Sequence, residues 1–132
     1  MEVGTPSPAW ARLGIRALGS DRGRGVAEME TGPDMLSRRG AVHTGFLGAL
    51  ADSAMALAVD GALAPGVGRT TFDLKLSVVA APGAGQRLRA VARVVHLGRR
   101  TAFADCRVES GEGGLVATAS ATFRLRGGGG AD

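Results

Sequence analysis

The sequence predicts a single α+β domain in which a curled antiparallel β-sheet wraps around a long central helix. Residues 40–66 are small and apolar on nearly every side, which predicts a helix that is buried all round. The residues that follow alternate between apolar and polar side chains in runs separated by Gly-rich turns, which predicts neighbouring antiparallel strands. A helix without a polar face must be enclosed by the sheet, because an outer position would leave one apolar side in water.

The elements before the helix are short. Residues 1–12 are expected to form a flexible lead-in with one helical turn, in which Pro8 suits the first helical position. Two strands are predicted on either side of the turn-rich GSDRGRG, from the pieces GIRAL and GVAEME. A loop with the sequence TGPDMLSRRG then leads into the central helix.

Four strands are predicted after the helix. In the first, the alternation gives one apolar face, with Phe72, Leu74, Leu76 and Val78, and one polar face, with Thr71, Asp73, Lys75 and Ser77. The other three strands come from QRLRAVARVVHL, TAFADCRVE and LVATASATFRLR. We place the domain at residues 13–126 and expect a disordered Gly-rich tail at residues 127–132.

Length and cysteine content favour a protein of a reducing compartment. The 132 residues suffice for one domain with its own core. Cys106 is the only cysteine, which excludes a disulfide within the chain. The N-terminal residues lack the apolar run of a secretory signal, and Asp52 and Asp60 interrupt the best candidate for a membrane span. The sequence therefore predicts a cytoplasmic protein that does not enter a membrane.

The net charge of +4 comes almost wholly from arginine, since Lys75 is the only lysine. Arginine binds phosphate and carboxylate groups in a planar fork, so an anionic ligand is expected. Nucleic acid is not the expected partner, because the sequence has no zinc-ligand spacing and no basic recognition helix. Its four Phe, one Trp and no Tyr also leave few rings on which bases could stack.

The predicted helix carries an unexpected residue, Asp52, and follows a histidine, His43. An ionised carboxylate on a helix without a polar face is costly to bury without partners. The stretch VHTGFLGALADSAMALA, together with the strand order, resembles the hotdog fold and, within it, the PaaI-like acyl-CoA thioesterases. The family motif is a histidine, two glycines and an acidic residue nine positions after the histidine, and His43 and Asp52 keep this spacing. The resemblance extends from about Leu13 to Arg126.

Two positions depart from the family pattern. Thr44 replaces the first glycine of the pair, and Ser37 stands where many relatives carry an amide side chain. Both positions lie at the reaction centre that the resemblance implies, so the departures affect either substrate choice or catalytic rate.

The resemblance implies a site for thioester hydrolysis, which needs a base or nucleophile and a stabiliser for the oxyanion. Asp52 would be the general base or nucleophile, in a pocket shared with a neighbouring subunit. Free backbone N–H groups of Thr44 and Gly45, at the helix N-terminus, would bind the oxyanion. His43 would position the carbonyl group or the loop, and Thr71 would hold the attacking water.

Each role has a structural alternative. Asp52 can instead form a hydrogen bond that holds a strand or a second subunit. His43 can be satisfied by backbone groups, and Thr71 can be an exposed strand residue. The residues alone leave these alternatives open, and the motif favours the catalytic interpretation.

A thioesterase for coenzyme A needs cationic contacts, because the cofactor carries a diphosphate and a ribose phosphate. The resemblance places these contacts in HLGRRT, at Gly98, Arg99, Arg100 and Thr101. Alternatively, an arginine pair in a hairpin turn can simply be exposed to solvent and bind no ligand. The acyl pocket is expected to be lined by four residues of the helix, namely Phe46, Leu47, Leu50 and Met55.

We interpret the sequence as a homodimeric or homotetrameric thioesterase that cleaves an acyl-CoA or acyl-carrier-protein thioester, without a metal or redox cofactor. An oligomer is expected because a single curled sheet leaves a strand edge open. One alternative is a non-catalytic acyl-CoA-binding hotdog protein, which the residues at positions 37 and 44 keep open. The other is a hotdog hydratase or dehydratase, whose usual motifs are missing from the sequence.

Overall fold

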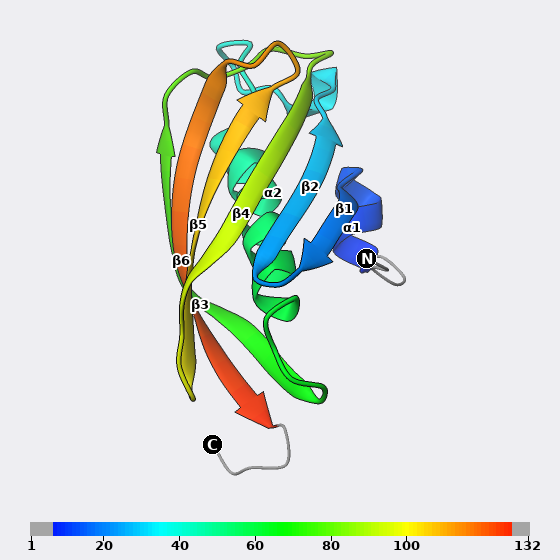
Figure 1. Ribbon diagram of the computed structural model, residues 1–132. Helices are drawn as coiled ribbons and strands as arrows, with labels where there is room; N and C mark the ends of the chain where they lie inside the picture. The colour runs from blue at the N-terminus through cyan, green and yellow to red at the C-terminus, as the bar shows by residue number, and fades with distance from the viewer. Residues whose placement is uncertain (1–6, 128–132) are drawn as a thin grey trace.

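Residues 7–127, which the structure describes, form a six-stranded antiparallel sheet that curls around one long helix (Figure 1). The structure is a computed structural model. The helices are α1 (Pro8–Leu13), the short 3-10 helix η1 (Pro33–Met35) and α2 (Thr44–Asp60). The strands are β1 (Arg16–Asp21), β2 (Arg24–Glu30), β3 (Val67–Val78), β4 (Arg87–Leu97), β5 (Thr101–Ser110) and β6 (Leu115–Gly127). They lie in the order β1-β2-β4-β5-β6-β3, which confirms the predicted α+β architecture.

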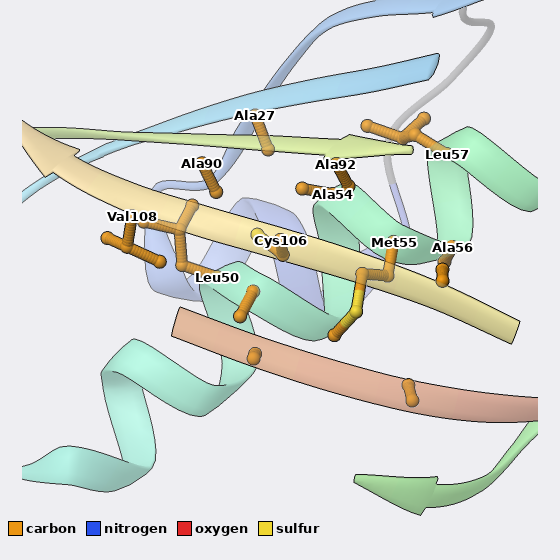
Figure 2. Packing of buried hydrophobic residues seen from close by; sticks show 14 of the residues in the cluster. Ala27, Leu50, Ala54, Met55, Ala56, Leu57, Ala90, Ala92, Cys106 and Val108 are labelled. Atoms are coloured by element: carbon orange, nitrogen blue, oxygen red, sulfur yellow. The ribbon is translucent and has the colours of Figure 1, made fainter. Parts of the chain in front are cut away.

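The sheet approaches α2 closely because both elements carry small side chains. Figure 2 shows Ala27 and Ala90 on the sheet and Ala54 on the helix, all within one buried cluster. The contact is tightest at Gly25 of β2, where an added Cβ atom would collide with the backbone of Ala54 and Ala58. A glycine is therefore required at this position, and the β2 backbone lies directly on the helix.

The N-terminal helix α1 is capped at both ends and packs against the core through two of its side chains. The Ser7 hydroxyl accepts a hydrogen bond of 3.1 Å from the Trp10 N–H, and Gly14 ends the helix in the left-handed conformation with φ of 71°. Trp10 and Leu13 are partly buried against the core. Residues 8–12 of the predicted flexible lead-in are thus part of a packed helix.

Two ends of the chain are not described. Residues 1–6 of the predicted lead-in and residues 128–132 of the predicted tail lie outside the described residues. Within residues 7–127, no helix has the length and the apolar character that a membrane crossing requires.

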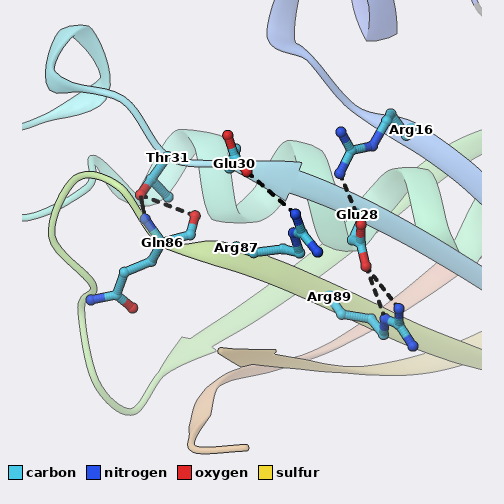
Figure 3. Close-up of polar contacts among 7 residues, drawn as sticks. All are labelled: Arg16, Glu28, Glu30, Thr31, Gln86, Arg87 and Arg89. Carbon is cyan, nitrogen blue, oxygen red and sulfur yellow. Dashed lines mark hydrogen bonds and ion pairs between the residues drawn. The ribbon is translucent and has the colours of Figure 1, made fainter. Parts of the chain in front are cut away.

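The outer face of the sheet carries arginines that are paired within the chain. Glu28 of β2, only 6% exposed, accepts hydrogen bonds from Arg16 of β1 at 2.8 Å and from Arg89 of β4 at 2.8 and 3.2 Å (Figure 3). The hydrogen bonds from Arg89 lower the pKa of Glu28, against the opposing effect of burial. Further ion pairs join Arg87 to Glu30, Arg93 to Asp105, and Arg107 to Glu109. Charge pairs therefore tie the edge strand β1 to β2 and β4.

Strand β3 contains a register shift that its sequence does not reveal. Thr71 and Asp73 pair with consecutive residues of β6, so Phe72 is an extra residue between them. The extra residue reverses the alternation, and Thr71 joins the helix-facing side with Leu74, since the β6 partners of both are buried. The prediction that Phe72 shares a face with Leu74 and that Thr71 points away is wrong. Phe72 is instead 74% exposed.

Candidate active site

The carboxylate of Asp52 lies beside Thr71. Helix α2 holds Asp52 half-buried, and the Thr71 hydroxyl donates a hydrogen bond of 2.7 Å to its Oδ1. Within the described residues, Asp52 has no ion pair and no second side-chain hydrogen bond, and no buried side-chain oxygen lacks a partner. The Oδ2 atom is therefore open to solvent. One oxygen is fixed and the other is available, which is the arrangement that a general base or nucleophile requires.

The Asp52 contact depends on the register shift in β3. Side chains alternate across a strand, so if Phe72 took a regular place in the pairing with β6, the hydroxyl of Thr71 would lie on the outer face, opposite to Leu74. No signal in the period-two pattern of the sequence marks this shift.

His43 is the N-cap of α2. Its ring accepts a hydrogen bond from one of the backbone N–H groups that were expected to bind the oxyanion. The Gly45 N–H donates a hydrogen bond of 3.1 Å to His43 Nδ1. Since Nδ1 accepts this bond, the neutral ring carries its proton on Nε2. The expectation of a free Gly45 N–H is wrong. The Thr44 N–H has no hydrogen-bond partner within residues 7–127, so it is the donor that remains available.

Ser37 lies in a tight turn that leads to His43. Its N–H donates to the Ala41 carbonyl at 2.7 Å, and its hydroxyl accepts from the Arg39 N–H at 3.3 Å. Gly40 has a φ of 82°, which a side chain rarely adopts, and so closes the turn. The Ser37 hydroxyl is therefore engaged in the loop itself.

The two parts of the candidate site are separated along α2. Thr44 and Asp52 are eight residues apart, which corresponds to about 12 Å along a helix axis. A carbonyl oxygen bound at the Thr44 N–H therefore lies out of reach of the Asp52 carboxylate in the same subunit. The structure brings Thr71 to Asp52 and His43 to Gly45, but it does not bring these two pairs together.

Of the four residues expected to line the acyl pocket, Phe46 reaches a cavity. This cavity has a volume of about 480 Å³ and lies beside α1 and η1. Leu47, Leu50 and Met55 have no exposed surface and belong to the core of the subunit. Sequence reasoning did not identify Leu13 and Met35, which also line the cavity, because they come from segments that the fold brings together.

The turn between β4 and β5 presents the predicted arginine pair. The Gly98 N–H donates to the Thr101 carbonyl at 2.8 Å, and Arg99 and Arg100 between them are exposed and make no ion pair within the described part of the chain. Across the sheet, Thr101 pairs with a β6 residue that also pairs with Thr70. Two strand spacings, about 10 Å, therefore separate the arginine turn from the strand segment that contacts Asp52.

Metal ligation and thiol chemistry have no site in the described residues. No three His, Cys, Asp or Glu side chains among residues 7–127 gather in a way that could hold a metal ion. Cys106 is 3% exposed, and burial raises the pKa of its thiol to about 12. The thiol is therefore protonated at neutral pH and is a core side chain.

A family model and a curated relative match this chain. The model of the thioesterase superfamily matches residues 39–117, from the loop before α2 into β6. A Pseudomonas aeruginosa protein named "Putative esterase PA0474" is 38% identical over 86 residues. The match covers 65% of this chain and 63% of the relative, so it spans less than two thirds of that protein.

Solved structures extend the match over most of the chain. The PaaI protein of the Escherichia coli phenylacetic acid degradation operon has a TM-score of 0.83 at 26% identity, over 89% of this chain and 83% of that chain. A mutant of the phenylacetic acid degradation protein PaaI from Thermus thermophilus has a TM-score of 0.82 at 36% identity, over 89% of this chain and 98% of that chain. The chain therefore belongs to the thioesterase superfamily and has the hotdog fold of the PaaI-like proteins.

Proposed function

We propose that the protein hydrolyses acyl-CoA thioesters, with Asp52 as general base or nucleophile. The observation that carries the proposal is the Asp52 carboxylate, whose Oδ1 accepts from Thr71 and whose Oδ2 is open. Membership of the thioesterase superfamily supports cleavage of a thioester. The Thr44 N–H, at the positive end of the α2 dipole, is the donor for the developing oxyanion.

The active form is a homodimer, or a tetramer built from two dimers, because one subunit does not complete the site. About 12 Å of helix separates Thr44 from Asp52, so the N-terminus of a second subunit's helix must supply the oxyanion donor. Strand β3 is the natural contact, since it pairs with β6 on one side and leaves its other edge unpaired among residues 7–127. The exposed Phe72 and Val79, at 74% and 62%, lie along or just beyond this edge.

Arg99 and Arg100 bind the phosphates of coenzyme A. Their guanidinium groups are free of carboxylate partners in the described residues, and the turn lies about 10 Å across the sheet from the Thr71 segment. A carrier-protein thioester carries one phosphate on its pantetheine arm, and it is the alternative substrate. The acyl-CoA is preferred here because two adjacent arginines suit a diphosphate better than a single phosphate.

The deciding experiment replaces Asp52 by Asn. This change keeps the shape and an oxygen that can accept from Thr71, but it removes the basic and nucleophilic oxygen. We expect hydrolysis of acyl-CoA to fall at least about a hundredfold while binding survives. Asp60→Asn is the matched control, because Asp60 lies on the same helix and pairs with Arg69 at the surface. Retained turnover per folded molecule in Asp52→Asn would end the mechanism.

A non-catalytic acyl-CoA-binding protein is the second candidate. It is favoured by the Gly45 N–H, which already donates to His43 and so leaves one donor fewer for an oxyanion. Binding of acyl-CoAs without release of free thiol would support it. Formation of a hydroxyacyl product from an enoyl-CoA would instead indicate a hydratase. A cytoplasmic location stays a prediction.

A further inference from the structure

We propose that the cavity between α1 and the first turn of α2 receives the acyl group of the substrate, so that α1 sets acyl selectivity. This inference rests on the thioesterase function proposed above. The cavity, of about 480 Å³, is bounded by α1, the end of β2, η1 and α2. Its apolar wall consists of Leu13, Met35 and Phe46, and its charged rim consists of Arg12, Glu30 and Asp34.

Backbone hydrogen bonds of His43 connect two residues that line the cavity, Met35 and Phe46, to the N-terminus of α2. The His43 N–H donates to the Met35 carbonyl at 2.8 Å, and the Phe46 N–H donates to the His43 carbonyl at 3.0 Å. Phe46 follows Thr44 by two residues, about 3 Å along the helix axis. A thioester whose carbonyl oxygen binds the Thr44 N–H can therefore extend its acyl group over Phe46 into the cavity.

Other hollows of the subunit lack this connection. Four further cavities in the described residues, of about 160 to 390 Å³, are lined by strands and turns. None of the four includes a residue of α2. The cavity at Phe46 is thus the one among these five that adjoins the helix carrying the candidate catalytic groups.

The lining selects a compact acyl group. Hydrocarbon gains free energy by leaving water for the wall formed by Leu13, Met35 and Phe46. A longer chain would pass this wall and cover the exposed charges of Arg12, Glu30 and Asp34, which costs free energy because charged groups need water or partners. The occupant is therefore a short apolar acyl group, such as hexanoyl, and not a long fatty acyl chain.

Filling the cavity tests the assignment. Leu13→Trp should lower kcat/KM for hexanoyl-CoA at least about tenfold and leave kcat/KM for acetyl-CoA within about twofold. Leu18→Trp is the matched control, because Leu18 is an exposed residue of β1 outside the cavity lining, and it should change neither value. Equal losses for acetyl-CoA and hexanoyl-CoA in a folded Leu13→Trp protein would overturn the assignment.

Enlarging the cavity gives an independent test if the tryptophan variant does not fold. Leu13→Ala should raise the ratio of kcat/KM for octanoyl-CoA to that for hexanoyl-CoA by at least about threefold. An unchanged ratio would overturn the assignment.

Direct binding separates this inference from the proposed function. Trp10, the only tryptophan, lies in α1 and packs against the core near the cavity. The non-hydrolysable thioether hexyl-CoA should change the Trp10 emission, whereas coenzyme A alone should not. A wild-type protein that cleaves no acyl-CoA but shows this difference would refute hydrolysis and retain the cavity. Turnover of hexanoyl-CoA without any emission change would refute the cavity and retain hydrolysis.

Discussion

Glu28 on the sheet is a buried carboxylate and Asp52 on α2 a half-buried one, and only Glu28 is paired with arginines in the described residues. Glu28 accepts hydrogen bonds from Arg16 and Arg89, and the bonds from Arg89 lower its pKa. Asp52 accepts one hydrogen bond, from the Thr71 hydroxyl, and has no ion pair within residues 7–127. A carboxylate paired with arginines within the chain supports the fold, whereas one that is accessible and has no ion pair is available to a ligand or another subunit.

The arginines show the same division. Several arginines in the strands have carboxylate partners, as in the pairs Arg93 with Asp105 and Arg107 with Glu109. Arg99 and Arg100 in the β4–β5 turn have none in the described residues. Arginines with carboxylate partners support the sheet, whereas the adjacent pair in this turn is a candidate for binding an anion.

The largest expected effect is a difference in the free energy of unfolding between variants of Glu28 and Asp52. Glu28→Gln removes the charge that two arginines share and should lower the free energy of unfolding by about 2 kcal/mol. Asp52→Asn should leave that free energy unchanged or higher, because a carboxylate placed for catalysis, as we propose for Asp52, is not placed for stability. Chemical denaturation at neutral pH measures both variants. Glu30→Gln is the control, since its pair with Arg87 is exposed and contributes less than about 1 kcal/mol.

The pH dependence of stability sharpens the assignment of Glu28. Because the folded protein lowers the pKa of Glu28, its contribution is complete above the unfolded pKa of about 4.3. The contribution is lost as the pH falls through the folded pKa. The unfolding free energies of wild type and Glu28→Gln should therefore converge as the pH falls from the unfolded pKa through the lower, folded pKa. A constant difference across this range would mean that packing, and not charge, stabilises the site.

A smaller effect is expected at Thr71, the residue that orients Asp52. Thr71→Val removes the hydrogen bond to Oδ1 and should lower kcat for acyl-CoA about tenfold with little change in KM, since catalysis depends on the orientation of the carboxylate. Thr71→Ser keeps the hydroxyl and should restore most of the rate. Thr70→Val is the control on the neighbouring exposed residue. If Thr70→Val and Thr71→Val behave alike, Thr71 is only a strand residue.

The arginine turn should affect binding more than chemistry. Replacing Arg99 and Arg100 together by alanine should raise KM for acyl-CoA about fivefold and leave kcat nearly unchanged, because phosphate contacts are equally strong in ground and transition states. The double alanine variant of Arg93 and Arg107 is the control. Steady-state kinetics with a truncated pantetheine thioester should show no change in KM. An equal response of both substrates would disprove the phosphate assignment.

The smallest effect concerns Cys106. Its thiol is 3% exposed with a pKa raised to about 12, so an aromatic disulfide reagent at pH 8 should not label the native protein. Labelling should become complete on unfolding in guanidinium chloride. Stoichiometric labelling of the native protein within minutes would show that the core opens around β5.

The sequence was sufficient for the architecture because the elements have strong local signals. Apolar residues on all sides of α2 require an enclosing sheet, and alternating side chains with Gly-rich turns define the strands. The inward row of β6, which includes Ala117 and Phe123, is buried as its alternation predicts. Short connections account for the pairs β1–β2, β4–β5 and β5–β6. The expectation that the strand after α2 pairs with its successor is wrong, because β3 pairs with β6 and β4 pairs with β2.

The site was less predictable because its details depend on contacts between segments. Alternation around Phe72 indicated the wrong face for Thr71, since a bulge has no periodic signature. The ring of His43 caps Gly45 by a bond that depends on the loop conformation. Leu47, Leu50 and Met55 are apolar helix residues like Phe46, and packing alone decides which of them reaches a cavity.

The bulge in β3 accommodates residue 72 without changing the pairing with β6 on either side of it. Phe72 is exposed and unpaired, so replacing its side chain should leave Thr71 facing the helix. Removal of residue 72 would leave Thr71 opposite Phe123 and Asp73 opposite Thr122, so plain alternation would return with the Thr71 hydroxyl still facing the helix. The length of this strand can therefore differ by one residue without moving the Asp52 contact, and homologues are best aligned here by register with β6 and not by residue type.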